Sequence, residues 1–125
     1  METRELALHA ARKMDQKGAE DLVVLELLDE QRLLYDYVVV ATGRSERQTK
    51  TLADEVYHFC KRWSISHFPT EGDKGWHLID CHQVICHAFT TELRDRYRIE
   101  ALYPGAIQLN LSDEWDGLAD PDLDR

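Results

Sequence analysis

Long apolar runs, a full set of cysteine pairs and an excess of basic residues are all missing from this chain of 125 residues. No apolar stretch is long enough to cross a bilayer, so we expect no membrane contact. The segment 1–17 starts with acidic residues and has no apolar core before a cleavage site, which excludes a secretory signal. Three cysteines, an odd number, indicate free thiols in a reducing compartment. We therefore expect a cytoplasmic protein.

The charge balance is acidic, with 24 Asp and Glu against 15 Lys and Arg and a formal net charge of -9. Neutralising phosphates requires a basic surface, so we expect little direct contact with RNA. The segment 112–125 contains six acids and one Arg, which gives -5 and leaves -4 for the 111 residues before it. These values predict a single domain over residues 1–111, followed by a mobile acidic tail over 112–125.

Hydrophobic periodicity predicts an α+β fold with a mixed, largely antiparallel sheet and helices packed on it. The expected helices span 3–17, 46–63 and 91–97. The expected strands span 21–28, 36–41, 65–68, 76–80 and 84–89, with a turn over 71–75, a turn or strand over 99–103 and an edge strand over 106–111. The short link between the first two strands predicts that they pair antiparallel.

The hairpin predicted over 76–89 lacks the polar face of a half-exposed sheet, because apolar residues point to both sides of it. Three modest helices leave part of such a sheet uncovered, and an uncovered apolar patch usually marks a partner surface. Burial in the core is the commoner role for any single aromatic residue. As a set near one edge of the sheet, however, Trp76, Phe89, Tyr97 and Tyr103 are typical of an interface hot spot.

The turn TGRS at 42–45 stands between a strand and a helix, where free backbone N–H groups attract anions. The same residues fit a helix cap better. Ser45 is a good N-cap, and Gln48 stands three residues later, where a capping-box side chain reaches back to the cap. No Walker lysine and no complete G-x-G-x-x-G accompany the turn, so the phosphate motif is absent.

Metal and nucleophilic sites are also weakly supported. The segment 81–87 contains two Cys-His candidates, but neighbouring residues on a strand point to opposite faces and cannot share one ion. A triad of Ser45, His87 and Asp80 lacks the G-x-S-x-G elbow, and Asp80 fits better as the residue that orients the hairpin turn. We therefore expect no catalytic residue, no metal and no cofactor.

One family accounts for the order and spacing of many short fragments between about residues 20 and 103. The fragments are DLVVLEL (21–27), DY (36–37) with VVVATGRS (38–45), Gln48, ADEV (53–56), EG (71–72), GW (75–76), Asp80, His87, Phe89, Arg94, Tyr97, Glu100 and Leu102. Each fragment alone is weak evidence for a family, whereas their order and spacing together are specific. In this respect the chain resembles the ribosomal silencing factor family, also called RsfS or Iojap-like.

The resemblance implies a translation repressor without enzymatic activity, on a fold that resembles a nucleotidyltransferase core without its catalytic carboxylates. Members of the family bind the large ribosomal subunit through a ribosomal protein on its intersubunit face. They block joining of the small subunit when nutrients are short. Ribosomal proteins are typically basic, and electrostatic complementarity then favours an acidic partner such as this chain. The residues that we expect at the contact are Glu71, Trp76, Leu78, Asp80, His87, Phe89, Glu100 and Tyr103, with the three acids facing basic groups.

This chain departs from the family pattern at three places, with His82-Gln83 where Gly-Asp is usual, Tyr103 for the terminal Trp, and Val38 for Phe. Two other functions stay open. One is a residual nucleotide-binding or nucleotidyltransferase-like protein that uses the turn from Gly43 to Ser45. The other is a homodimeric adaptor that pairs through the same apolar face. This function could coexist with ribosome docking, and dimer formation and docking should then compete.

Overall fold

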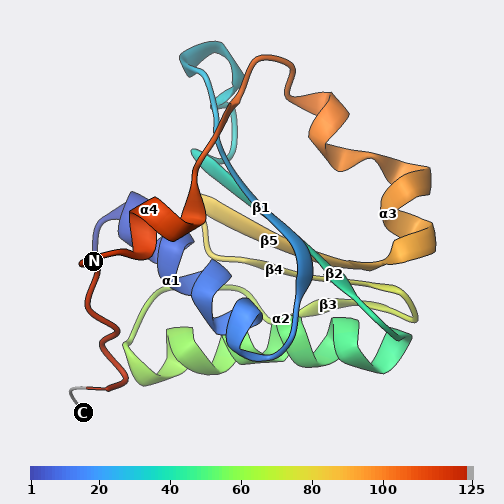
Figure 1. Cartoon of the computed structure of the whole chain (residues 1–125), viewed down its shortest axis with the longest axis horizontal. Helices are drawn as coiled ribbons and strands as arrows, with labels where there is room; N and C mark the ends of the chain where they lie inside the picture. The colour runs from blue at the N-terminus through green and yellow to red at the C-terminus, as the bar shows by residue number, and fades with distance from the viewer. Residues whose placement is uncertain (124–125) are drawn as a thin grey trace.

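The computed structural model describes residues 1–123, which form a six-stranded sheet with helices on both faces (Figure 1). The strands are β1 (Glu20–Glu26), β2 (Tyr37–Gly43), β3 (Glu71–Asp73), β4 (Trp76–Asp80), β5 (Val84–Thr90) and β6 (Ile107–Gln108). The helices are α1 (Thr3–Gln16), α2 (Glu46–Arg62), α3 (Thr91–Tyr97) and α4 (Leu111–Trp115), with 3₁₀ turns η1 (Asp29–Gln31) and η2 (Ile99–Leu102). The predicted α+β class is confirmed.

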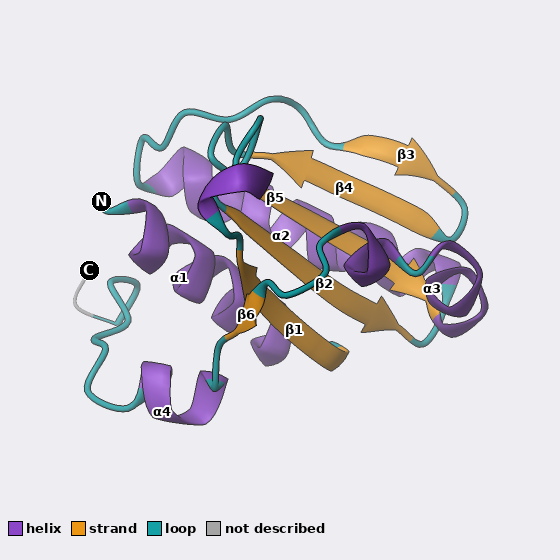
Figure 2. Ribbon diagram, turned by 90° about the horizontal axis from the view of Figure 1, so that it is seen from above, coloured by secondary structure: helices purple, strands orange, loops and turns teal. Residues whose placement is uncertain are grey.

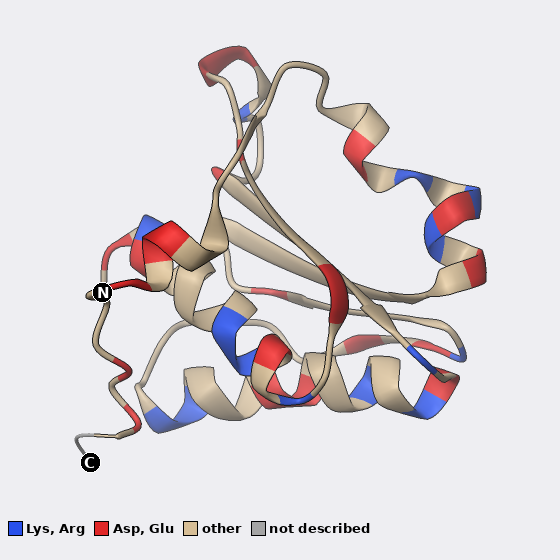
Figure 3. Ribbon diagram, viewed as in Figure 1, with Lys and Arg blue, Asp and Glu red and all other residues tan. Residues whose placement is uncertain are grey.

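The sheet has the order β3-β4-β5-β2-β1-β6, and only β2 and β5 pair in parallel. These two strands lie at its centre and carry no charged residue, as the uncoloured ribbon in Figure 3 shows. All seven residues of β2 are buried. A strand covered on both faces must be apolar on both, which explains the continuous run VVVA at 38–41. The predicted antiparallel pairing of β1 with β2 is confirmed.

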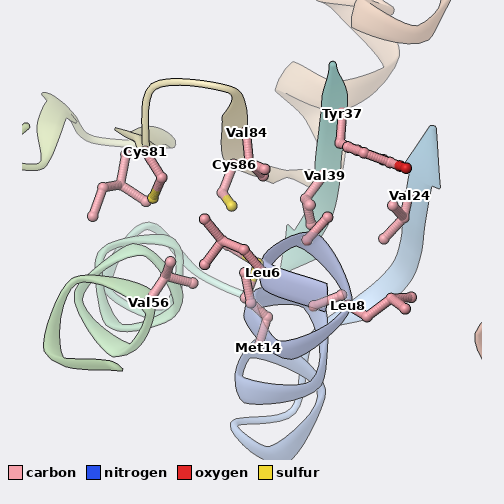
Figure 4. Close-up of a cluster of buried hydrophobic side chains, with 14 of the residues drawn as sticks. Leu6, Leu8, Met14, Val24, Tyr37, Val39, Val56, Cys81, Val84 and Cys86 are labelled. Atoms are coloured by element: carbon pink, nitrogen blue, oxygen red, sulfur yellow. The ribbon is translucent and has the colours of Figure 1, made fainter. Parts of the chain in front are cut away.

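Helices α1 and α2 cover one face of the sheet. Leu52, Val56 and Phe59 of α2 are fully buried, and Leu6 and Met14 of α1 are also buried. Their four-residue and three-residue spacings place these side chains on one side of each helix. Figure 4 shows Leu6, Met14 and Val56 facing the inward side chains of the strands, which include Val24 and Val39. This helix–sheet layer is the main core.

The opposite face is covered only in part, by α3, η2 and the chain that leads into β6 (Figure 2). Its buried centre consists of Leu25, Leu27, Val38, Val40, Ile85 and Phe89. Toward β4 the cover thins, and the side chains of Trp76 and Leu78 are only partly buried. The expected uncovered apolar region therefore exists, and it lies beside α3.

Two local predictions need correction, and a third is made more specific. No strand forms over 65–68: Phe68 N–H donates to the Asp80 carbonyl (2.9 Å), but Pro69 has no N–H and interrupts the pairing. Strand β3 forms where the sequence predicts a turn over 71–75, and the actual turn is confined to Lys74 and Gly75. The segment 99–103, expected as a turn or strand, is the 3₁₀ turn η2.

The segment expected to be a mobile tail lies instead against α1 and α2 as far as residue 123. Lys13 Nζ is 2.9 Å from each carboxylate oxygen of Asp120 and 2.8 Å from Asp122 Oδ2. Arg62 is also paired with Asp122, at 2.7 Å, and Trp115 Nε1 donates to the Leu8 carbonyl at 2.9 Å. Residues 124–125 lie outside the described part. Three of the five acids in residues 112–123, Glu114, Asp120 and Asp122, therefore have basic partners within the domain.

Candidate docking groove

An open groove of about 430 Å³ lies between the β3–β4 hairpin and α3. Its apolar lining comes from Trp76 and Leu78 on β4 and from Leu93 and Tyr97 on α3. The rim belongs to β3 and the turn after it. It carries two carboxylates, from Glu71 and Asp73, and one ammonium group, from Lys74. The groove thus combines an apolar floor with a mainly acidic rim.

Two glycines permit the close packing that forms this groove, Gly75 between the hairpin and α3 and Gly72 within the hairpin. A Cβ on Gly75 would lie 2.9 Å from both Leu93 Cδ1 and Thr90 Oγ1, so this position has no room for a side chain. Gly72 has a φ of +109°, and a Cβ there would lie 2.1 Å from the Trp76 carbonyl oxygen. Only glycine combines this backbone conformation with such close approach.

Trp76 is fixed within a group of stacked rings. Its ring centroid lies 5.0 Å from that of Phe89, its cross-strand neighbour, and 5.1 Å from that of Tyr97. Its indole Nε1–H donates to His87 Nδ1 at 3.2 Å. Ring distances in this range are favourable for aromatic pairs. The indole is therefore held in place while part of it stays open to a partner.

The eight residues expected at a contact surface are divided among three places. Trp76, Leu78 and Glu71 line the groove. His87 and Phe89 lie beneath it, with exposed fractions of 5% and 0%, so they support Trp76 without being open to a partner. The remaining three are Asp80, at the far end of β4, and Glu100 and Tyr103, in and after η2.

Asp80 and Glu100 already have partners inside the domain. Asp80 accepts hydrogen bonds from Tyr35 Oη and from the His82 backbone N–H, both at 2.7 Å, as a residue that orients the hairpin turn should. Glu100 is paired with Arg94 at 2.9 Å. Glu71, by contrast, has no ion-pair partner among residues 1–123. Of the three acids, Glu71 is the best placed to meet a basic partner.

Arg94 fixes the position of α3 and η2 over the sheet. Besides Glu100, its guanidinium donates to Thr42 Oγ1 (3.0 Å) and to the Asp21 carbonyl. A second cavity surrounds this group, and Arg98 also lines it. Because the Arg94 donors bond to β1, β2 and η2 together, the residue links the cover of this face to two neighbouring strands of the sheet.

The alternative chemistry has little geometric support. Ser45 Oγ accepts from the Gln48 N–H at 3.1 Å, and Gln48 Oε1 accepts from the Arg44 N–H at 2.6 Å, so the side chain reaches one residue beyond the expected cap. These bonds occupy two of the donors that an anion would use. Cys86 lies in the helix–sheet core and His87 on the other face, as the strand geometry predicts. Among residues 1–123, no cluster of three metal-ligating side chains occurs.

Burial gives His87 a pH dependence that can be measured. Loss of solvent lowers the pKa of His87 to about 4, and its Nδ1 must stay unprotonated to accept from Trp76. A folded-state pKa below the unfolded value of about 6.5 stabilises the domain above pH 6.5, and this stability is lost as the pH falls toward 4.

We therefore expect the free energy of unfolding to fall by about 2–3 kcal/mol between pH 7 and pH 4 through this group. Urea titrations of the wild type and of His87→Leu at several pH values would test this. The variant should lose less stability on acidification. It will still show some loss, because burial also lowers the pKa of His9 and of His77. Equal losses in the two proteins would contradict the assignment to His87.

Comparison with known proteins gives a consistent result. The family model described as "Ribosomal silencing factor during starvation" matches residues 1–123. The chain belongs to the ribosomal silencing factor family. It is 32% identical over 107 residues to the ribosomal silencing factor of Chromobacterium violaceum, covering 84% of this chain and 87% of that protein. It is 29% identical over 108 residues to that of Bacillus subtilis, covering 85% and 91%.

Solved structures extend the agreement to three dimensions. A crystal structure of a Chromobacterium violaceum protein superimposes with a TM-score of 0.78 at 32% identity, covering 84% of this chain and 88% of that one. A Bacillus halodurans crystal structure gives a TM-score of 0.70 at 30% identity, covering 85% and 99%. The family match begins before residue 20 and extends beyond residue 103, so this silencing factor includes α1 and α4 in the family domain.

Six of the nine residues that line the groove were not among the eight expected contact residues: Gly72, Asp73, Lys74, Gly75, Leu93 and Tyr97. Leu93 and Gly75 are both essential to its shape, yet neither was among the expected contact residues. A signal for Leu93 exists in the sequence, because it precedes Tyr97 by four positions in a short helix and must share a face with it.

No helix in residues 1–123 of this chain has the length and hydrophobicity needed to cross a bilayer.

Proposed function

We propose that this silencing factor binds the large ribosomal subunit through a basic ribosomal protein on the intersubunit face and, by occupying that face, prevents the small subunit from joining when nutrients are scarce. The groove beside α3 is the docking surface in this proposal. The observation that carries it is the open apolar floor of Trp76, Leu78 and Tyr97, which the helices on this face leave partly exposed.

The composition of the groove fits such a partner. Large aromatic side chains that are already held in place lose little conformational entropy on binding, and they dominate interface energies. The rim carboxylates of Glu71 and Asp73 would meet basic side chains, while the net charge of -9 repels RNA phosphates. Docking on protein, with little direct RNA contact, follows from this combination.

Inhibition by occupancy requires no catalysis. The polar side chains near the carboxyl ends of the parallel strands β2 and β5 have structural roles and are not arranged for catalysis. Thr42 Oγ1 accepts a hydrogen bond from Arg94, and Thr90 Oγ1 caps α3 by accepting from the Leu93 N–H at 3.4 Å. A domain of this size placed on the joining surface excludes the other subunit by volume alone. We therefore propose a cytoplasmic repressor without enzymatic activity, which acts as a removable steric block.

Sedimentation with separated ribosomal subunits tests the proposal. We expect the protein to migrate with the large subunit in a sucrose gradient and to reduce the joined-ribosome peak when the small subunit is added. Higher salt should weaken the association, because the rim charges are exposed. Failure to migrate with the large subunit even at low salt would refute the proposal.

A matched pair of variants locates the contact. Tyr97 and Phe68 are aromatic residues with the same exposed fraction, 49%, but only Tyr97 lines the groove; Phe68 lies against His82 at the opposite end of β4. Tyr97→Ala should weaken binding to the large subunit by about tenfold, and Phe68→Ala by less than about twofold. Equal effects would place the contact elsewhere. A variant that binds the large subunit more weakly should also reduce the joined-ribosome peak less than the wild type does.

A further inference from the structure

The three cysteines of the chain all lie in the helix–sheet core, away from the groove. Cys60 comes from the last turn of α2, Cys81 follows β4, and Cys86 is in the middle of β5. Figure 4 shows the sulfur atoms of Cys81 and Cys86 directed toward the helices that cover this face. All three are free thiols, with exposed fractions of 0% for Cys60 and Cys86 and 4% for Cys81. None of them lines the groove that we propose as the docking surface.

Two of these thiols are in direct contact. The sulfur atoms of Cys60 and Cys81 are 3.6 Å apart, within the distance of a weak S–H···S hydrogen bond. A disulfide requires about 2.05 Å between its sulfur atoms, so the two atoms must approach by roughly 1.5 Å. Small rotations of two short side chains can supply such a movement. The two residues are 21 positions apart in the sequence, so the contact depends on the tertiary fold.

The position of Cys81 gives a small oxidant a route to this pair. Cys81 begins the tight turn between β4 and β5, and its N–H donates to the Val84 carbonyl at 2.8 Å. The next two residues, His82 and Gln83, are exposed. Opening this short surface turn would uncover the Cys81 sulfur, and with it the Cys60 sulfur 3.6 Å away, without separating the helices from the sheet. Cys86 lacks this route, because it lies within the central part of the sheet.

We propose that Cys60 and Cys81 form a reversible disulfide when the protein meets a hydroperoxide. With hydrogen peroxide, the thiolate of Cys60 attacks a peroxide oxygen, the O–O bond breaks, and a sulfenic acid and hydroxide result; the hydroxide takes up the proton that Cys60 released. The Cys81 sulfur then attacks the Cys60 sulfur, the S–O bond breaks, and the departing hydroxide takes the Cys81 proton and leaves as water. With hydrogen peroxide, two thiols and one peroxide yield one disulfide and two waters.

The electrostatics of the pair support this order of steps. The hydrogen bond from Cys81 lowers the pKa of Cys60, even though burial opposes the shift. The same hydrogen bond, together with burial, raises the pKa of Cys81. The first proton therefore leaves from Cys60, and the thiolate is the nucleophile in reactions of this kind. Burial raises the pKa of Cys86, which keeps that thiol protonated and unreactive.

A bond at this position would join the end of α2 to the end of β4. The loop that it closes contains all of β3 and β4, the hairpin that forms one wall of the groove. Cross-linking this loop restricts the unfolded chain, so oxidation should raise the Tm by about 5–10 °C. The bond lies on the face of the sheet opposite the groove. We therefore expect oxidised and reduced protein to dock equally well, and the two proposals fail or succeed separately.

The test is to treat the folded protein with hydrogen peroxide and compare peptide maps with and without a reducing agent. The expected product is a monomer that has lost two hydrogens, contains a linked pair of peptides with Cys60 and Cys81, and returns to the starting mass with dithiothreitol. Cys60→Ala and Cys81→Ala should each abolish the link and the rise in Tm. Cys86→Ala, the matched control from the same core, should retain both.

Several outcomes would overturn the proposal. One is an absence of linkage under conditions in which the urea-unfolded chain oxidises. Others are a link through Cys86, a bond between two chains, or conversion of the thiols to sulfinic acid instead of a disulfide. Thermal unfolding of each variant in the reduced form shows that it is folded, and Cys60→Ser provides a second variant if Cys60→Ala is not.

Discussion

Replacing Lys13 by Met should lower the free energy of unfolding by about 3–5 kcal/mol at pH 7, a large share of the stability of a domain of this size. The Lys13 side chain is only 4% exposed, and its ammonium lies between the carboxylates of Asp120 and Asp122, which are 5% and 20% exposed. Removing the cation leaves two carboxylates close together, one of them buried. An uncompensated buried charge is among the most costly defects in a folded protein.

The chain contains a matched control for this effect. Lys50 and Asp54 form an ion pair of 2.7 Å, close to the 2.8 Å between Lys13 and Asp122, but the Lys50 side chain is 65% exposed. Lys50→Met should therefore cost less than about 1 kcal/mol. Urea unfolding of both variants measures the difference. If Lys13→Met costs no more than Lys50→Met, the contacts of residues 111–123 do not stabilise the domain.

Acid should reduce the difference between the wild type and Lys13→Met. Burial alone would raise the pKa of Asp120 and of Asp122, but hydrogen bonds from Lys13 and other donors lower both below the ordinary 3.8. A lowered carboxyl pKa stabilises the folded state above about pH 4, and this stability disappears as the pH falls through the folded-state value. The two unfolding curves should thus approach each other below pH 4. Adding Asp120→Asn to Lys13→Met should recover part of the loss at pH 7.

The same ion pairs show why the C-terminal segment could not be predicted from the sequence. A run of acids without nearby bases usually belongs to a solvated tail, and composition favours that interpretation. The partner of Asp120 is 107 positions away, on the first helix. One signal was present: Lys13 stands beside Met14 and three positions after Ala10, at the edge of a buried apolar stripe. A cation in such a position needs an anion, but the sequence does not say which one.

The elements with strong periodicity were predictable because burial alone determines their pattern. The two central strands must be apolar on both faces, and α2 must repeat its apolar residues along one side. The hairpin alternation likewise placed Trp76 and Leu78 on one face. The ion pair between Glu100 and Arg94 could not be predicted, because it is a tertiary contact that the sequence does not show. The sequence thus predicted the β4 residues of one wall of the groove, whereas the placement of α3 as the other wall depends on the tertiary fold.

Trp76→Ala should weaken binding to the large ribosomal subunit by about 100-fold, if the groove is the docking surface as proposed. The indole lies between Phe89 and Tyr97 and donates to His87, so it is already ordered before a partner arrives. An ordered, partly exposed tryptophan contributes a large apolar area at a small entropic cost. Trp76→Phe keeps a ring in this place but loses the hydrogen bond, and it should have a smaller effect.

Loss of folding is the main competing explanation, and Trp115 provides the control for it. Trp115 is also partly buried and also donates its Nε1–H, to the Leu8 carbonyl at 2.9 Å, but it lies on α4, away from the groove. Trp115→Ala should destabilise the domain to a similar extent, by about 2–3 kcal/mol, without weakening binding once the variant is folded. Sedimentation at equal concentrations of folded protein compares the two. If Trp115→Ala reduces binding as much as Trp76→Ala, the apolar floor beside α3 is not the contact, because binding then follows stability and not the position of the tryptophan.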